Sequence, residues 1–125
     1  MLYQFIMATI ECYVPAMSAE DISITAESFS RSDSFTGVTI LSGVSLRSTQ
    51  TLRSIAEAAS EKFILIYTKD LPLEMGLFAL DRFIAVAEDT KADMLYADHY
   101  ELIDGQRRKH PLIECQAGAL RDDFD

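Results

Sequence analysis

Apolar residues along the chain form short, β-rich runs that alternate with stretches of helical spacing. The clearest run covers residues 63–67 and stops abruptly at Thr68-Lys69-Asp70. An unbroken apolar run of this length is typical of a strand buried on both faces of a parallel sheet, so we expect it at the sheet centre. Three other runs predict a first strand, a short buried strand and a fourth strand; they are residues 1–10, 37–41 and 94–96.

Two helices are predicted between the first three strands. Ser18, with Asp21 three residues later, predicts the N-cap of a first helix that reaches about Ser30. Ser48 or Thr49 can cap a second helix. The predicted inner face of this second helix consists of Leu52, Ile55, Ala56 and Ala59.

A third helix and a hairpin follow the central run. Pro72 fits the first turn of a helix. The predicted apolar stripe of this helix consists of Leu73, Leu77, Leu80, Ile84 and Ala87. Asp104-Gly105 suits a type I′ turn between hairpin strands at 100–103 and 106–110. Residues 11–15 and 31–36 are expected to be loops, and no element is assigned to residues 111–125.

Strands that alternate with helices predict a three-layer α/β domain, with a mainly parallel sheet and helices on both faces. We assign residues 1–125 to one such domain, because the chain has 125 residues and no linker or repeat. The net charge of −9 and the lack of a large basic cluster argue against a nucleic-acid surface. His99 and His110 lack metal-ligand spacing and are expected at the surface.

Cysteine usage and the N-terminus indicate a cytoplasmic protein. Cys12 and Cys115 suggest two reduced thiols rather than a disulfide framework. Residues 1–10 are apolar but lack the basic start and cleavage site of a signal peptide, and they are too short to span a membrane.

Acidic residues at predicted strand ends are the candidates for chemistry. Asp70 should lie at the carboxyl end of the central strand, where open α/β sheets bind ligands. Its carboxylate could hold a metal ion or a phosphate-bearing substrate, or it could cap the following helix. Asp98 could add a second carboxylate or be a polar loop residue. Glu11 could contact a nucleotide or be a loop acid, and Lys69 could neutralise phosphate or be solvated.

Three stretches lie at the ends of the predicted strands. They are Ala8-Thr9-Ile10-Glu11, then Leu41-Ser42-Gly43 with Ser48-Thr49-Gln50-Thr51 after a short insertion, and Thr68-Lys69-Asp70. Their order and spacing resemble those in the nucleotide-sugar-binding half of family 2 glycosyltransferases, which have the Rossmann-like GT-A fold. In that family the corresponding stretches are a Pro-Thr-Tyr-Asn-like turn, an acidic pair with Gly-Ser-Thr-Asp-Gly-Thr, and the DxD motif. The resemblance extends over residues 1–125, including Leu71-Pro72-Leu73-Glu74 and residues 92–98.

This resemblance implies a nucleoside diphosphate sugar as ligand and a Mg²⁺ or Mn²⁺ ion that neutralises the leaving diphosphate. The implied nucleotide-sugar contacts are Thr9, Glu11, Ser42, Lys69 and Asp98, and the implied metal ligand is Asp70.

The chain departs from the family pattern at its acids. Ser42 and Gly43 replace the acidic pair that helps to hold uracil and ribose, and Thr68 replaces the first Asp of DxD. The family's catalytic base lies in an acceptor half beyond the matched stretches. No carboxylate of this sequence is placed to deprotonate an acceptor hydroxyl. We therefore expect no sugar transfer by this chain alone.

The sequence thus favours the donor-binding part of a bacterial-type glycosyltransferase, with an incomplete GT-A-like domain. The alternative is a non-catalytic binding or assembly module that has kept the fold and lost the site. A flavodoxin-like regulatory domain fits less well, because Glu11 alone does not supply an acidic pair after the first strand. An uncovered sheet edge and apolar surface would favour a homo-oligomer.

Overall fold

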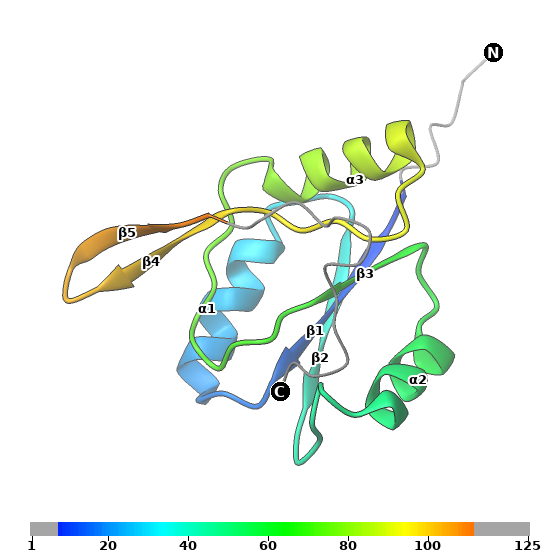
Figure 1. Ribbon diagram of the computed structural model, residues 1–125, viewed down its shortest axis with the longest axis horizontal. Coiled ribbons are helices and arrows are strands. Elements are labelled where there is room, and N and C mark those ends of the chain that lie inside the picture. The colour runs from blue at the N-terminus through cyan, green and yellow to red at the C-terminus, as the bar shows by residue number, and fades with distance from the viewer. Residues whose placement is uncertain (1–7, 112–125) are drawn as a thin grey trace. The chain divides into compact units, whose positions relative to one another are not determined.

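The computed structural model describes residues 8–111 and has an α/β fold (Figure 1). Contacts divide the chain into two compact units, Met1–Ala92 and Asp93–Asp125, which we describe separately. The first unit contains β1 (Ile10–Pro15), α1 (Ala19–Phe29), β2 (Phe35–Leu41), α2 (Thr49–Ala58), β3 (Phe63–Ile66) and α3 (Ala79–Thr90). The second contains β4 (His99–Ile103) and β5 (Gln106–His110). The assignment of the whole chain to one domain stays a prediction.

In the described part of the chain, β1 is the central strand of a three-stranded parallel sheet with the order β2-β1-β3. The prediction that residues 63–67 form the central strand is therefore wrong. β3 lies at an edge, and its Ile64 is 38% exposed. The predicted burial of β2 is also wrong, since none of its residues is fully buried. An apolar run indicates a strand, but it does not indicate which strands will flank it.

β1 occupies a stretch for which the pattern predicts a loop. Residues 1–7 of the predicted first strand lie outside the described residues, and the next two residues precede β1. The strand continues through Glu11 because Ile10, Cys12 and Val14 alternate with it and are buried on one face. A single acid between such residues does not break the period of two.

The core of the first unit lies between the sheet and the helices α1 and α3. Its buried residues are Ile10, Cys12, Val14, Phe29 and Leu80. Tyr13 alternates with these residues in β1 and is also buried, as is Ile55 of α2, which is not part of the cluster. Figure 1 shows α1 and α2 on opposite sides of the strands, as expected for helices on both faces of a sheet.

Cys12 is fully buried in β1, and burial together with the charge of Glu11 raises the pKa of its thiol to about 12. The reactive thiolate is therefore scarce near neutral pH. In a Cys115→Ser variant, which leaves Cys12 as the one thiol, we expect Ellman's reagent to label the folded protein slowly and the urea-unfolded protein at once. Fast labelling of the folded protein would contradict the burial of Cys12.

The first two helices begin where they were predicted. Ser18 caps α1, and its hydroxyl oxygen accepts a hydrogen bond from Asp21 N at 3.1 Å. α2 begins directly after Ser48. Its predicted inner face is only partly correct, because Ile55 is 2% exposed whereas Leu52 is 45% exposed.

α3 begins at Ala79, later than predicted, so the placement of Pro72 in the first turn of a helix is wrong. Residues 70–78 form an irregular segment before the helix, and Leu77 within it is 74% exposed. The later part of the predicted stripe is confirmed, because Leu80 and Ala87 are buried within α3.

Two hydroxyl groups of α1 hold the segment before α3. The oxygens of Thr25 and Ser28 accept hydrogen bonds from Leu73 N at 3.0 Å and from Met75 N at 2.6 Å. Two donors that lie two residues apart and both face α1 indicate an extended backbone rather than a helix. Gly76 further disfavours a helix in this segment.

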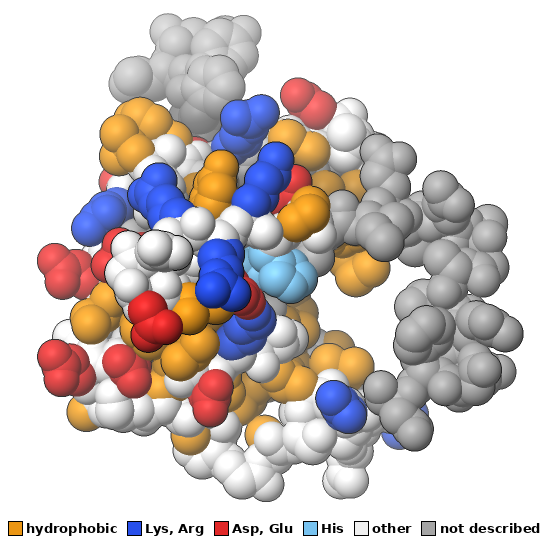
Figure 2. All heavy atoms as spheres, turned by 60° about the vertical axis from the view of Figure 1, so that its left-hand side comes forward, with side chains coloured by type: hydrophobic (Ala, Val, Ile, Leu, Met, Phe, Trp, Pro, Cys, Tyr) orange, Lys and Arg blue, Asp and Glu red, His pale blue; other side chains and the backbone are white. Residues whose placement is uncertain are grey.

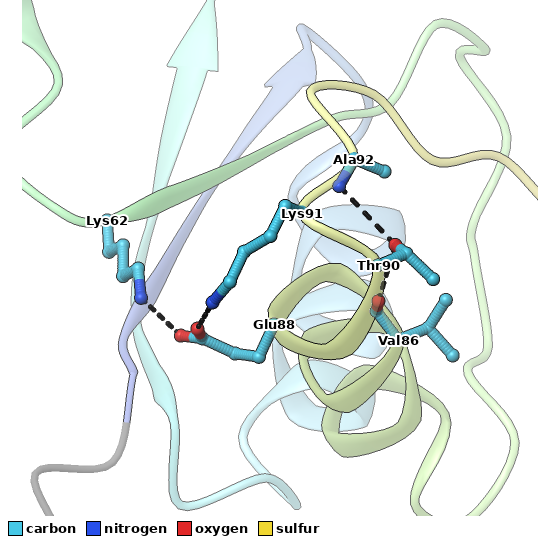
Figure 3. A network of polar contacts seen from close by, with 6 residues as sticks. All are labelled: Lys62, Val86, Glu88, Thr90, Lys91 and Ala92. Atoms are coloured by element: carbon cyan, nitrogen blue, oxygen red, sulfur yellow. Dashed lines mark hydrogen bonds and ion pairs between the residues drawn. The ribbon is translucent and has the colours of Figure 1, made fainter.

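Polar contacts surround the C-terminal end of α3 (Figure 3). Glu88 pairs with Lys62, just before β3, and with Lys91 at 3.7 Å. The hydrogen bond from Lys62 lowers the pKa of the Glu88 carboxyl group. Ala92 N donates to Thr90 Oγ1 at 3.3 Å. These contacts link the end of α3 to the start of β3.

The hairpin of the second unit forms as predicted. β4 and β5 are antiparallel, and Asp104 and Gly105 have φ angles of 50° and 75°, as a type I′ turn requires. The rings of His99 and His110 stack with their centroids 4.7 Å apart, so the two predicted surface histidines form a pair.

Residues 94–96 are not a strand, so the predicted fourth parallel strand is wrong. Met94 in this run is 72% exposed. Residues 112–125 of the tail lie outside the described residues. Within the described part of the chain, every helix is too short or too polar to cross a membrane.

Candidate functional site

The strand order places a topological switch point at the carboxyl ends of β1 and β3. From β1 the chain passes through α1 to β2 on one side, and then through α2 to β3 on the other side of β1. The connections thus reverse direction between β1 and β3, and open α/β sheets bind ligands outside the carboxyl ends at such a point. Hydrogen bonds from Tyr67 N to Tyr13 O (2.9 Å) and from Ala16 N to Leu41 O (3.0 Å) extend the sheet up to this edge.

A pocket of about 540 Å³ opens at the same edge. Pro15, Leu41 and Thr68 line it from the ends of the three strands, and the loop between β2 and α2 supplies the rest. The lining loop residues are Val44, Ser45, Leu46 and Arg47. This volume lies within the range of about 300–1,000 Å³ that is usual for small-molecule sites. A second hollow, between α1 and the start of α3, has only about 10 Å³ and is too small for a ligand.

Arg47 gives the pocket a positive charge, and the lining includes no carboxylate. Gly43, with a φ of 67°, turns the chain after β2. Ser45 closes the loop, because its hydroxyl oxygen accepts from Arg47 N at 3.2 Å and its carbonyl oxygen accepts from Ser48 N at 3.1 Å. The backbone of Arg47 is thus held just before the N-terminus of α2, whose first turn has no acid, and the residue is exposed. A guanidinium group and a helix N-terminus together favour an anion.

Three of the predicted site residues lie at this edge of the sheet. Ser42 directly follows β2, and Lys69 and Asp70 follow β3, but none of the three lines the pocket. Ser42 and Asp70 are exposed, and Lys69 is half-buried and interacts with another group. Asp70 does not cap a helix, because α3 begins only at Ala79, so that alternative interpretation is wrong.

The residues around Asp70 do not by themselves make a metal centre. Among residues 8–111, no group of three His, Cys, Asp or Glu side chains is arranged to hold a metal ion. Mg²⁺ usually binds through one or two carboxylates together with substrate phosphates and water. A divalent ion at Asp70 would therefore need most of its ligands from a bound diphosphate.

Two further predicted residues lie at the opposite edge of the sheet. Thr9 precedes β1, and its hydroxyl group donates to the carboxylate of Glu61. The Glu11 carboxylate accepts a hydrogen bond from Ser60 N at 2.9 Å, which stabilises the turn before β3. Six residues of extended chain, about 20 Å, separate Thr9 from Pro15 in the pocket. Thr9 and Glu11 therefore lie at the other end of β1 from the pocket.

Asp98 belongs to the second unit, where it directly precedes β4 and interacts with another group. It does not line the pocket of the first unit.

The loop that forms most of the pocket wall was not predicted from the sequence pattern. Residues 44–47 interrupt the match to the glycosyltransferase pattern as a short insertion, and they carry no motif of that family. Two signals could have identified them. The loop after the second strand of a doubly wound sheet borders the carboxyl edge, and Arg47 is the only Lys or Arg between Arg31 and Arg53 in the sequence.

Comparisons of the chain with protein-family models, with curated proteins and with solved structures found no match. The function is therefore inferred from the pocket and from the residues around it.

Proposed function

We propose that the first unit binds a nucleoside diphosphate sugar in the pocket at the carboxyl edge of its sheet. It would act as the donor-binding part of a glycosyltransferase-like protein that transfers the sugar to a hydroxyl group. The observation that carries this proposal is the position of Arg47 in a pocket of about 540 Å³ at the carboxyl ends of all three strands. The positive charge of Arg47 would neutralise part of the negative charge of the diphosphate.

The lining of the pocket fits the three parts of such a ligand. Arg47 can bind phosphate oxygens through two parallel N–H donors. Pro15, Leu41, Val44 and Leu46 supply apolar walls for a base or a sugar ring, and the hydroxyl groups of Ser45 and Thr68 can bind sugar hydroxyls. The lining charge matters because the chain has a net charge of −9, which repels anions at long range.

We propose no catalytic base among the described carboxylates. A Mg²⁺ or Mn²⁺ ion would be bound jointly by the diphosphate and Asp70. If such an ion binds, it would neutralise the charge of the leaving diphosphate. Arg47 supplies positive charge at the pocket with or without the ion.

Replacing Arg47 with glutamine should weaken the binding of UDP or GDP by about tenfold or more, which corresponds to about 1.4 kcal/mol. The change removes the cation that lines the pocket and keeps a polar side chain of similar length. Isothermal titration calorimetry with each nucleotide, with and without Mn²⁺, measures the effect. Asp70→Asn should remove any enhancement by Mn²⁺ and leave metal-free binding unchanged.

Arg53→Gln is the matched control, because Arg53 is exposed on α2 and does not line the pocket. It changes the net charge by the same amount as Arg47→Gln. Because it leaves the pocket lining intact, it should leave nucleotide binding almost unaltered. Equal losses in the two variants would show a general charge effect and would contradict a site at Arg47. Absence of binding heat from either nucleotide at millimolar concentration, with the protein folded, would reject the proposed function.

The alternative function is a binding or assembly module without a donor site. The observation that favours it is the apolar surface of the segment before α3, where Leu71, Leu77 and Phe78 are 60%, 74% and 70% exposed. Exposed apolar side chains often mark protein contacts where they form a patch. This alternative predicts no nucleotide binding in the calorimetric experiment.

A further inference from the structure

The β4–β5 hairpin of the second unit has two open edges, because within residues 8–111 each of its strands pairs only with the other. It is also well exposed: Tyr100 is 63% and Leu102 is 73% exposed, and every residue of β5 is exposed. A lone two-stranded hairpin is at best marginally stable in water. A third strand on one of the edges would stabilise it.

The two edges of the hairpin differ in charge. β5 contains Arg107, Arg108 and Lys109, which are three of the eleven Lys and Arg residues of the chain. Figure 2 shows the left-hand side of Figure 1 from the front. Several Lys and Arg side chains and a histidine lie close together on this face. Charged side chains of this kind keep other strands away from an exposed edge.

β4 has no such protection. Its sequence is His-Tyr-Glu-Leu-Ile, in which Glu101 is the one residue charged at neutral pH. Tyr and Ile favour strands, and no proline interrupts them. The hairpin therefore has one edge that is protected against pairing and one edge that is open to it.

The backbone groups of Tyr100 face the open edge of β4. Next to a two-residue type I′ turn, the flanking pair Ile103–Gln106 exchanges hydrogen bonds, and hydrogen-bonded and non-hydrogen-bonded pairs then alternate. Tyr100 and Lys109 are thus a non-hydrogen-bonded pair, so their N–H and C=O groups point out of the hairpin on opposite edges. Tyr100 makes no backbone hydrogen bond outside the hairpin to another described residue.

We propose that the open edge of β4 pairs antiparallel with the same edge of a second copy of this chain, about a two-fold axis at Tyr100. The two Tyr100 residues would exchange their backbone hydrogen bonds and form a four-stranded sheet with β5 on both outer edges. This register places Glu101 of each copy opposite His99 of the other copy. His99 stacks on His110, so each carboxylate would face a histidine pair. A carboxylate and an imidazole N–H group that face each other across strands can form a hydrogen bond. Within one copy, Glu101 Oε1 lies 3.7 Å from His99 Nε2.

The position of the cations favours a second copy over a nucleic acid as the occupant. A nucleic acid would be drawn to the three clustered cations. Those cations lie on β5, whereas the open edge belongs to β4. In the two-fold arrangement the two β5 strands are separated by both β4 strands, so their positive charges do not oppose each other.

Light scattering coupled to size-exclusion chromatography should give twice the 14.0 kDa monomer mass for the unaltered protein at micromolar concentrations. Tyr100→Pro removes the N–H group at the centre of the proposed pairing and should give a monomer. Lys109→Pro is the matched control, because Lys109 lies directly opposite Tyr100 and its N–H group faces the protected edge. This control should remain a dimer.

A second variant keeps the test independent of proline. Tyr100→Lys leaves every backbone group in place but sets two cations opposite each other, so it should also shift the protein to monomer. Circular dichroism checks that each variant is folded. A monomeric unaltered protein would overturn the proposal, as would a dimer that survives both changes at Tyr100. Loss of the dimer in Lys109→Pro alone would overturn it as well, because it would assign the contact to β5. These outcomes do not depend on nucleotide binding.

Discussion

Replacing Leu80 with alanine should lower the free energy of unfolding by about 2–5 kcal/mol, whereas the same change at Leu77 should alter it by no more than about 0.5 kcal/mol. Leu80 is 3% exposed and belongs to the core cluster with Phe29 and Val14, but Leu77 is 74% exposed before α3. Both changes remove the same atoms, so the comparison isolates burial. Urea denaturation followed by circular dichroism measures both losses.

The changes at Leu77 and Leu80 distinguish the observed start of α3 from the earlier start that the sequence pattern predicts. The pattern places Leu77 and Leu80 on one apolar stripe, and it therefore predicts a large loss at both positions. In the structure α3 begins between them, at Ala79, so only the second should matter. Comparable losses at both positions would contradict this start of α3.

Elements with a local chemical signal could be predicted from the sequence. The hydroxyl group of Ser18 caps α1 within its own first turn, and Asp104-Gly105 adopts the positive φ angles that a type I′ turn requires. Such signals involve residues that are neighbours in the sequence, so they do not depend on the rest of the fold. The existence of β3 and of the buried positions Leu80 and Ala87 could also be predicted, because their apolar periodicity is strong.

Features that depend on distant partners could not be predicted in this way. The central position of β1 is set by pairing with both β2 and β3, which no single stretch encodes. The irregular segment before α3 is set by hydroxyl groups of α1, which lie almost fifty residues earlier in the sequence. Helical spacing in residues 73–77 was therefore overridden by tertiary contacts.

The unexpected positions of Thr9 and Glu11 follow from the placement of the first strand. A strand at residues 1–10 would put Glu11 at the carboxyl end of the sheet, close to Asp70. Because β1 instead begins at Ile10, Thr9 and Glu11 lie at its amino end, where they bind Glu61 and Ser60. Asp70 and Ser42 were placed at the correct edge, since β2 and β3 end close to their predicted positions.

Removing both α1 hydroxyl groups that hold the segment before α3 should cost more than any single surface change. Thr25→Val and Ser28→Ala would each leave a backbone N–H group, at Leu73 or at Met75, without its acceptor. An unsatisfied buried donor costs about 1–3 kcal/mol. Thr25 and Ser28 are 1% and 5% exposed, so water cannot easily replace either oxygen. Urea denaturation of both single variants and of the double variant measures the losses.

The double variant should lose less than the sum of the single losses, because both hydroxyl groups hold one segment and the first loss already frees part of it. Ser23→Ala is the matched control, since Ser23 is exposed on the same helix, and it should change stability by no more than about 0.5 kcal/mol. Amide hydrogen exchange at Leu73 and Met75 provides a local measurement and should accelerate in the double variant more than exchange in β1. Unchanged protection at both amides would show that other contacts hold residues 70–78, and the late start of α3 would then have a different cause.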